Sequence, residues 1–167
     1  PDVIIGFSVG GTLAYYLACE WNKRTHHSPA VCLGDSFMPH KAINVKPLTT
    51  DSAWIVERRM EDHIGELSQT DRLTLHDMLL YSFSVAAKLL NSAPPFPSYD
   101  GKVALIRALK GDMKTKLLNK ANEARIRMKV KHLTVTKIKD RDHFGLCLDG
   151  DLAIIVSDIV NGLVDNA

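Results

Sequence analysis

The sequence predicts an α/β fold, with a mostly parallel sheet covered by flanking helices. The first observation is a set of short apolar runs at residues 2–7, 30–35 and 102–108, of which the run at 30–35 shows no polar–apolar alternation. Such runs are expected of parallel strands that are buried on both faces. The second observation is that helical patterns separate the runs, which is the order of βαβ units. The third is that reactive residue types stand at the carboxyl ends of the runs, where open α/β sheets place their sites.

The first half of the chain continues with a helix, a strand and a loop. An amphipathic pattern predicts the helix over 10–23, the second strand follows over 30–35, and residues 40–50 are predicted to be a loop. His26 and His27 are neighbours in the connection before the second strand. Without a third ligand nearby they indicate a polar loop, and we expect no metal site there.

Two helices are predicted between the second and third strands, over 51–66 and 71–91, with Asp71 as the N-cap of the latter. The apolar face of the second helix comprises Leu73, Leu75, Met78, Leu79, Phe83, Ala86, Ala87 and Leu90. A helical stretch of roughly 50 residues is too long for a simple crossover. We therefore expect a helical lid inserted at about 46–98; the alternative is an extra helical layer packed away from the site.

The last third of the chain holds two more strands and two helices. The third strand, over 102–108, precedes a basic stretch, over 114–131, that is expected to be helical. Residues 132–138 alternate polar and apolar side chains, which predicts a fourth strand near the sheet edge. The final helix is expected at roughly 150–165.

A Gly-x-Ser-x-Gly signature, formed by Gly6, Ser8 and Gly10, stands between the first strand and the first helix. Strand, tight turn and helix in this order are the context of a nucleophile elbow; the alternative is a plain glycine-rich turn. We expect side chains at Gly6 and Gly10 to clash with the neighbouring strand and helix. The backbone N–H of Val9 would then point to where an oxyanion forms.

A serine hydroxyl needs a nearby base, and the base needs a partner that fixes its tautomer. His143 is predicted in a loop after the fourth strand and just before the last helix. The acid is either Asp35, at the end of the second strand, or Asp112, after the third. Asp142 is badly placed to reach the ring of its neighbour. The order serine, acid, histidine is that of α/β-hydrolases.

Residues 6–14 resemble the elbow of the thioesterase domains that terminate nonribosomal peptide and polyketide synthetases, in which a further glycine such as Gly11 is typical. Residues 33–36 resemble the acid-bearing strand end of that family, and residues 106–108 resemble its next strand.

The stretch Asp142-His143-Phe144 resembles the family's Gly-Asp-His-aromatic motif, with Arg141 in place of the glycine. The resemblance runs from residue 2 to about 160. It favours Asp35 as the acid, whereas Asp112 matches the position used by many other α/β-hydrolases, including stand-alone editing thioesterases.

The resemblance implies a serine thioesterase. Ser8 would accept an acyl or peptidyl chain from the phosphopantetheine thiol of a carrier-protein domain, and His143 would activate water or a substrate nucleophile for hydrolysis or cyclisation. No cofactor would be bound by the domain itself. The alternatives are another α/β-hydrolase, such as an esterase or editing thioesterase, and a non-catalytic module that docks a carrier domain.

The same resemblance implies that residues 1–167 are the C-terminal portion of one thioesterase-like domain. The strands before the elbow, and the loop that carries the second oxyanion donor, would then be absent from this chain. We expect the isolated chain to have weak or no activity. The exposed edge of the first strand would favour self-association.

Composition is that of a soluble globular protein, with 46% hydrophobic and 24% charged residues. No apolar run approaches the roughly 20 residues of a membrane span, and the first residues are not a signal peptide. Cys19, Cys32 and Cys147 are widely spaced, as in a reduced, cytoplasmic protein without a metal site.

Charge is unevenly distributed, since residues 101–141 hold 13 Lys and Arg against three Asp and Glu. This basic segment is either a solvated face or a docking face for an acidic or phosphate-bearing partner. We expect no nucleic acid and no membrane among the partners.

Overall fold

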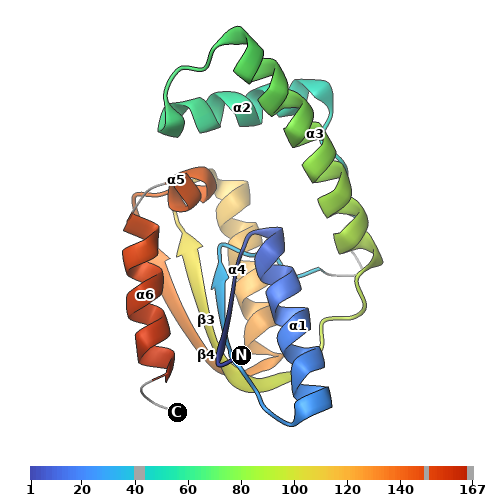
Figure 1. The fold of residues 1–167 in the computed structure, drawn as a ribbon, viewed down its shortest axis with the longest axis vertical. Helices are drawn as coiled ribbons and strands as arrows, with labels where there is room; N and C mark the ends of the chain where they lie inside the picture. Colours follow the sequence, from blue (N-terminus) through green and yellow to red (C-terminus); the bar gives the residue numbers. More distant parts are fainter. Residues whose placement is uncertain (40–43, 149–150, 165–167) are drawn as a thin grey trace. The chain divides into compact units, whose positions relative to one another are not determined.

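The computed structural model describes residues 1–39, 44–148 and 151–164, which form two compact units (Figure 1). One unit consists of Pro1–Met38 and Phe96–Ala167, and the other of Pro39–Pro95. The predicted 40–50 loop and 150–165 helix each include positions outside the described residues. The unit boundary falls near the predicted 46–98 insertion, whose role as a lid stays a prediction.

The first unit contains a parallel sheet of four strands in the order β1-β2-β3-β4 within the described residues. Its strands are β1 (Val3–Phe7), β2 (Ala30–Gly34), β3 (Tyr99–Ala108) and β4 (Val130–Ile138). The register pairs Ile5 with Cys32, Leu33 with Leu105, and Leu105 with Val135. The predicted parallel sheet is therefore confirmed, with β4 at one edge.

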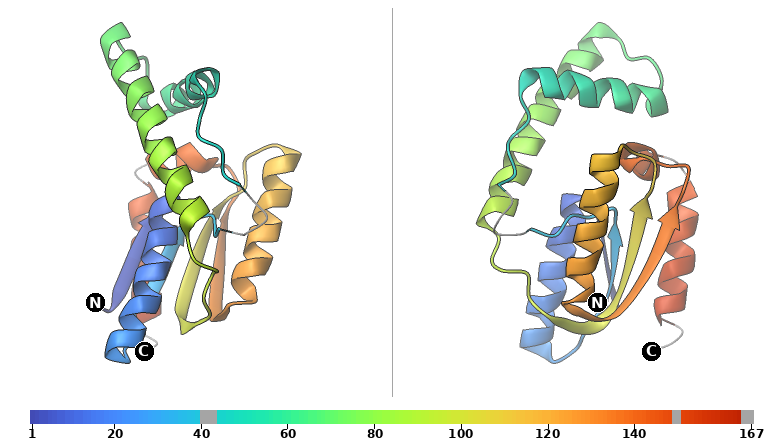
Figure 2. Two further views of the ribbon diagram at one scale, coloured as in Figure 1. Left: turned by 90° about the vertical axis from the view of Figure 1, so that its right-hand side faces the viewer. Right: turned by 180° about the vertical axis from the view of Figure 1, so that it is seen from behind.

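Helices cover both faces of this sheet. On one face α1 (Val9–Thr25) and α4 (Met113–Arg127) pack against β2 and β3, through side chains that include Tyr15 and Ile126. On the other face α6 (Asp151–Val164) packs through Ile155, Ile159 and Leu163, and the short α5 (His143–Leu148) adds Leu146. The helices can be followed from two further sides in Figure 2.

The second unit is a pair of helices, α2 (Thr50–Ile64) and α3 (Gln69–Ser92). Their N-caps are Thr49 and Ser68, whose hydroxyls accept hydrogen bonds from the backbone N–H groups of Ser52 and Asp71. The prediction of Asp71 as the N-cap was wrong, because the helix begins two residues earlier than expected. The Asp71 carboxylate instead accepts from the Ser68 hydroxyl at 2.6 Å.

The interior of the second unit is partly polar. Glu57 is fully buried, and its Oε1 lies 3.3 Å from Nε of Arg72. The ring of Trp54 stacks on that of His76, with 3.9 Å between the ring centroids. Leu79 and Ala87 are buried as predicted for α3, but Leu73 and Met78 of the predicted apolar face are more than half exposed. None of the described helices combines the length and apolar character needed to cross a membrane.

Candidate active site

The Gly-x-Ser-x-Gly stretch forms a tight turn between β1 and α1. Ser8 has φ 54° and ψ −123°, in a region that non-glycine residues rarely adopt. Two backbone hydrogen bonds hold it there: Ser8 N–H donates to the Gly34 carbonyl at 2.8 Å, and Gly11 N–H donates to the Ser8 carbonyl at 3.2 Å. This is the strained strand-to-helix geometry expected of a nucleophile elbow.

The glycines of the turn differ in why they are needed. A Cβ on Gly6 would lie 2.2 Å from the Gly10 carbonyl oxygen, and one on Gly11 would lie 1.8 Å from Oγ of Ser36. A Cβ on Gly10 would meet nothing within 4 Å. The expected clash is therefore confirmed at Gly6. The prediction was wrong at Gly10, where an added Cβ would lie in open space. At Gly11 an added Cβ would clash with the buried segment after β2.

Asp35 and His143 are brought together at the carboxyl edge of the sheet. Nδ1 of His143 lies 2.9 Å from Oδ2 of Asp35, although 108 positions separate the two residues. Asp35 follows β2 and is held by its own N–H, which donates to the Ile106 carbonyl at 2.8 Å. His143 is the first residue of α5 rather than a loop residue as predicted, and the Asp142 carboxylate accepts from Gly145 N–H at 2.8 Å within that turn.

The imidazole of His143 lies beside the elbow. Its ring centroid is 4.9 Å from that of Phe7, the residue directly before Ser8. The Asp35 side chain is 8% exposed and that of His143 is 37% exposed, so the carboxylate is screened from water while the ring reaches the surface. Ser8, Asp35 and His143 thus lie at the same end of the sheet, on segments that follow β1, β2 and β4.

Burial alone would raise the pKa of Asp35, but its charged partners outweigh this effect. The hydrogen bond and charge of His143, together with the Arg107 guanidinium, hold the pKa of Asp35 below its ordinary value. The carboxylate therefore stays ionised, as is needed of a group that orients an imidazole and stabilises its protonated form.

Arg107 is a site residue that sequence reasoning missed, because it was read as part of an apolar strand. It is 2% exposed, and its Nη1 lies 3.3 Å from Oδ1 of Asp35. The N–H of Ala108 donates to the same oxygen at 3.3 Å. The available signal was the basic residue itself, since a charged side chain inside a buried strand needs a partner.

Asn122 is a second residue near the site that the sequence did not indicate, because it lies within the basic stretch 114–131. It is fully buried on α4, where Nδ2 donates to the Ser36 carbonyl at 2.8 Å and Oδ1 accepts from Met38 N–H at 3.0 Å. Thr12 Oγ1 of α1 donates to the Phe37 carbonyl at 2.7 Å. The segment of residues 36–38 is therefore hydrogen-bonded to both α1 and α4.

Asp112, the alternative acid, is the N-cap of α4. Its Oδ1 accepts from Thr115 N–H at 2.7 Å. Nδ1 of His143, in contrast, has Asp35 as its partner.

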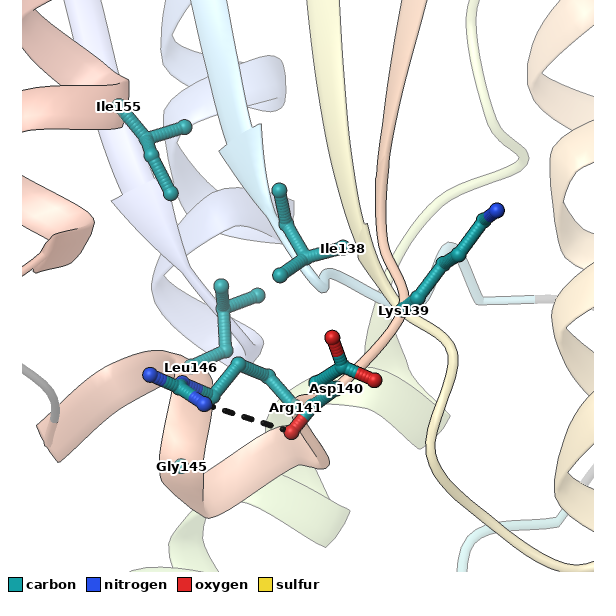
Figure 3. A pocket seen from close by; sticks show the side chains of 7 residues that line it. All are labelled: Ile138, Lys139, Asp140, Arg141, Gly145, Leu146 and Ile155. Carbon is teal, nitrogen blue, oxygen red and sulfur yellow. Dashed lines mark hydrogen bonds between the residues drawn. The ribbon is translucent and has the colours of Figure 1, made fainter.

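A cavity of about 190 Å³ is lined by residues of the segment around His143, which include Arg141 and Gly145 (Figure 3). Ile138, Leu146 and Ile155 give it an apolar wall, and Arg141, which also lines it, donates to the Asp140 carbonyl at 3.5 Å. Its lining does not include Ser8, Asp35 or His143.

No family model matches the sequence, and no curated protein matches it. Solved structures do match. The Vlm2 thioesterase domain, solved with a bound dodecadepsipeptide, aligns with TM-score 0.57 at 16% identity over 95% of this chain and 65% of that domain. BorB, a type II thioesterase from the borrelidin biosynthetic cluster, aligns with TM-score 0.62 at 16% identity over 93% of this chain and 64% of BorB.

Human thioesterase 2 aligns with TM-score 0.57 at 12% identity, over 99% of this chain and 74% of that protein. The chain spans slightly less than two thirds of the Vlm2 domain and of BorB. At these identities the similarity concerns the fold. The chain therefore has the α/β-hydrolase fold of thioesterases.

Proposed function

We propose that the chain carries the catalytic residues of a serine thioesterase, with Ser8 as nucleophile, His143 as base and Asp35 as the orienting acid. The observation that carries this proposal is the 2.9 Å contact between His143 Nδ1 and Asp35 Oδ2, next to a serine in a strained elbow. The thioesterase fold supports the reaction class.

The contact between His143 and Asp35 supports a separate role for each of the three residues. With Nδ1–H donating to Asp35, Nε2 of His143 is the nitrogen that accepts the proton of the Ser8 hydroxyl. The serine oxygen attacks the thioester carbonyl and the thiol leaves with that proton, which yields an acyl-Ser8 intermediate. Water or a substrate nucleophile then attacks the acyl carbon while His143 takes its proton. The ester bond to Ser8 breaks, and His143 returns the proton to the serine oxygen.

Val9 is the proposed oxyanion donor. It is the first residue of α1, and the N–H groups of a helix's first turn have no acceptor within the helix. An N–H directly after the nucleophile is the usual first donor of an elbow.

The proposed substrate is an acyl or peptidyl chain on the phosphopantetheine arm of a carrier-protein domain, and that carrier domain is the proposed partner. The kinds of thioesterase that share the fold support this assignment. Release by hydrolysis and release by cyclisation use the same three residues, so both belong to the proposal.

The test is covalent labelling of Ser8 by a fluorophosphonate probe, followed by turnover of an acyl-pantetheine thioester and its oxygen-ester analogue. We expect slow labelling in the wild type, in keeping with the weak activity expected of a chain without its second oxyanion donor. Labelling should be absent in Ser8→Ala and slower by at least about a hundredfold in His143→Ala. Ser28→Ala is the control and should label normally. A wild type that does not label while binding a carrier domain would support a non-catalytic docking module instead.

A further inference from the structure

A second cavity lies next to the end of β3, and its lining includes none of Ser8, Asp35 and His143. It has a volume of about 500 Å³ and lies among the end of β3, the first turns of α4 and the end of β4. This size is within the range of small-ligand sites. Four lysines line it, namely Lys116, Lys120, Lys137 and Lys139.

The lysines are placed on facing elements. Lys116 and Lys120 are four residues apart, so they share one face of α4, whereas Lys137 lies near the end of β4 and Lys139 directly follows the strand. Like charges at this spacing repel each other, and the arrangement therefore costs stability unless an anion lies between them.

Acidic groups compensate little of this charge. Glu123 is the acidic side chain in the lining, and it is already engaged with Arg127 at 2.9 Å and Lys137 at 3.7 Å. Within the part of the chain that the structure describes, Lys116, Lys120 and Lys139 form no ion pair.

Arg107 adds a buried positive charge to the wall of the cavity. One nitrogen contacts Asp35, but Nε and Nη2 have no hydrogen-bond partner among the described residues, and the side chain is 3% exposed. A buried guanidinium with unpaired donors is costly, and a nearby anion would offset that cost.

The rest of the lining is mostly apolar, with Thr115 and Asn119 as its uncharged polar members. Leu109, Met113 and Leu117 contribute to it, with Met113 72% and Leu117 59% exposed. A ligand that fills this cavity would thus combine a group of high negative charge with an apolar portion.

We propose that this cavity binds a small organic phosphate, with the phosphate between the lysines of α4 and β4 and the apolar portion against Met113 and Leu117. Several lysine point charges suit a dianion better than a single carboxylate. The proposal does not depend on the thioesterase reaction.

The experiment titrates the 167-residue chain by calorimetry with n-butyl phosphate, inorganic phosphate and butanoate. We expect n-butyl phosphate to bind most tightly. Lys116→Gln/Lys120→Gln should weaken its binding by about tenfold or more, since each lost charged hydrogen bond has that order of effect. Lys129→Gln/Lys131→Gln removes the same charge from exposed positions outside the cavity and should leave the affinity within about twofold.

A second variant tests the apolar portion. Met113→Ser/Leu117→Ser changes exposed side chains and should abolish the preference for n-butyl phosphate over inorganic phosphate. Equal weakening by the two lysine pairs would overturn the proposal in favour of non-specific charge attraction. Equal binding of n-butyl and inorganic phosphate by the wild type would overturn the organic ligand in favour of free phosphate.

Discussion

At the scale of single residues, the Asp35 carboxylate contacts two side chains of the site, the imidazole of His143 and the guanidinium of Arg107. Its lowered pKa means that the folded state favours the ionised form. This contribution to stability is fully present above the carboxyl pKa of the unfolded chain and is lost as the pH falls through the folded value.

Asp35→Asn should therefore lower the free energy of unfolding by about 3 kcal/mol at pH 7, because it leaves Arg107 buried without a counter-charge. The difference from wild type should shrink as the pH falls below about 3.9, where the unfolded carboxyl becomes protonated. Urea unfolding at pH 7 and pH 3 measures both. Asp77→Asn, at an exposed position, is the control, and a pH-independent difference would contradict the assignment.

Arg107→Met should raise the pKa of Asp35, because it removes the cation whose Nη1 lies 3.3 Å from the carboxylate. A carboxyl-carbon NMR titration of Asp35 measures the shift. Lys131→Met removes an exposed charge elsewhere and should leave that titration unchanged. An unchanged titration in Arg107→Met would mean that Arg107 does not contribute to the lowered pKa of Asp35.

At the scale of elements, the elbow depends on how closely α1 approaches the segment after β2. Gly11→Ala should destabilise the fold by about 2 kcal/mol or more, because its Cβ would lie 1.8 Å from Oγ of Ser36. Gly10→Ala is the matched variant and should be neutral or slightly stabilising, since its Cβ meets open space within a helix. Thermal unfolding ranks the two, and adding Ser36→Gly to Gly11→Ala should recover part of the loss.

The strands and the serine turn were predictable because each depends on residues that are close together in the sequence. Short apolar runs indicated β1, β2 and β3, and the Gly-x-Ser-x-Gly signature indicated the turn after β1. The partners of Arg107 and Asn122 were not predictable, because each depends on which strand or loop the fold places opposite. The N-cap of α3 was misplaced because Ser68 and Asp71 have equally suitable side chains, and the choice depends on backbone geometry.

At the scale of the whole molecule, none of the described residues from 39 to 95 belongs to either apolar core of the sheet unit. Replacing this helical pair by a Gly/Ser linker of about ten residues should therefore preserve cooperative unfolding of the sheet unit. Circular dichroism during thermal unfolding tests this. Loss of the cooperative transition would show that the sheet unit needs the helical pair for its stability.

The 108-position separation between Asp35 and His143 has a consequence for folding kinetics. Every strand pairing in the sheet is parallel and joins distant segments, and such topologies fold slowly because the entropy of loop closure is lost before the contacts form. The acid and the base can meet only after β2, β3 and β4 are aligned and α5 has docked. During refolding, the ability of Ser8 to react should therefore return with the final tertiary phase, well after helical content has recovered.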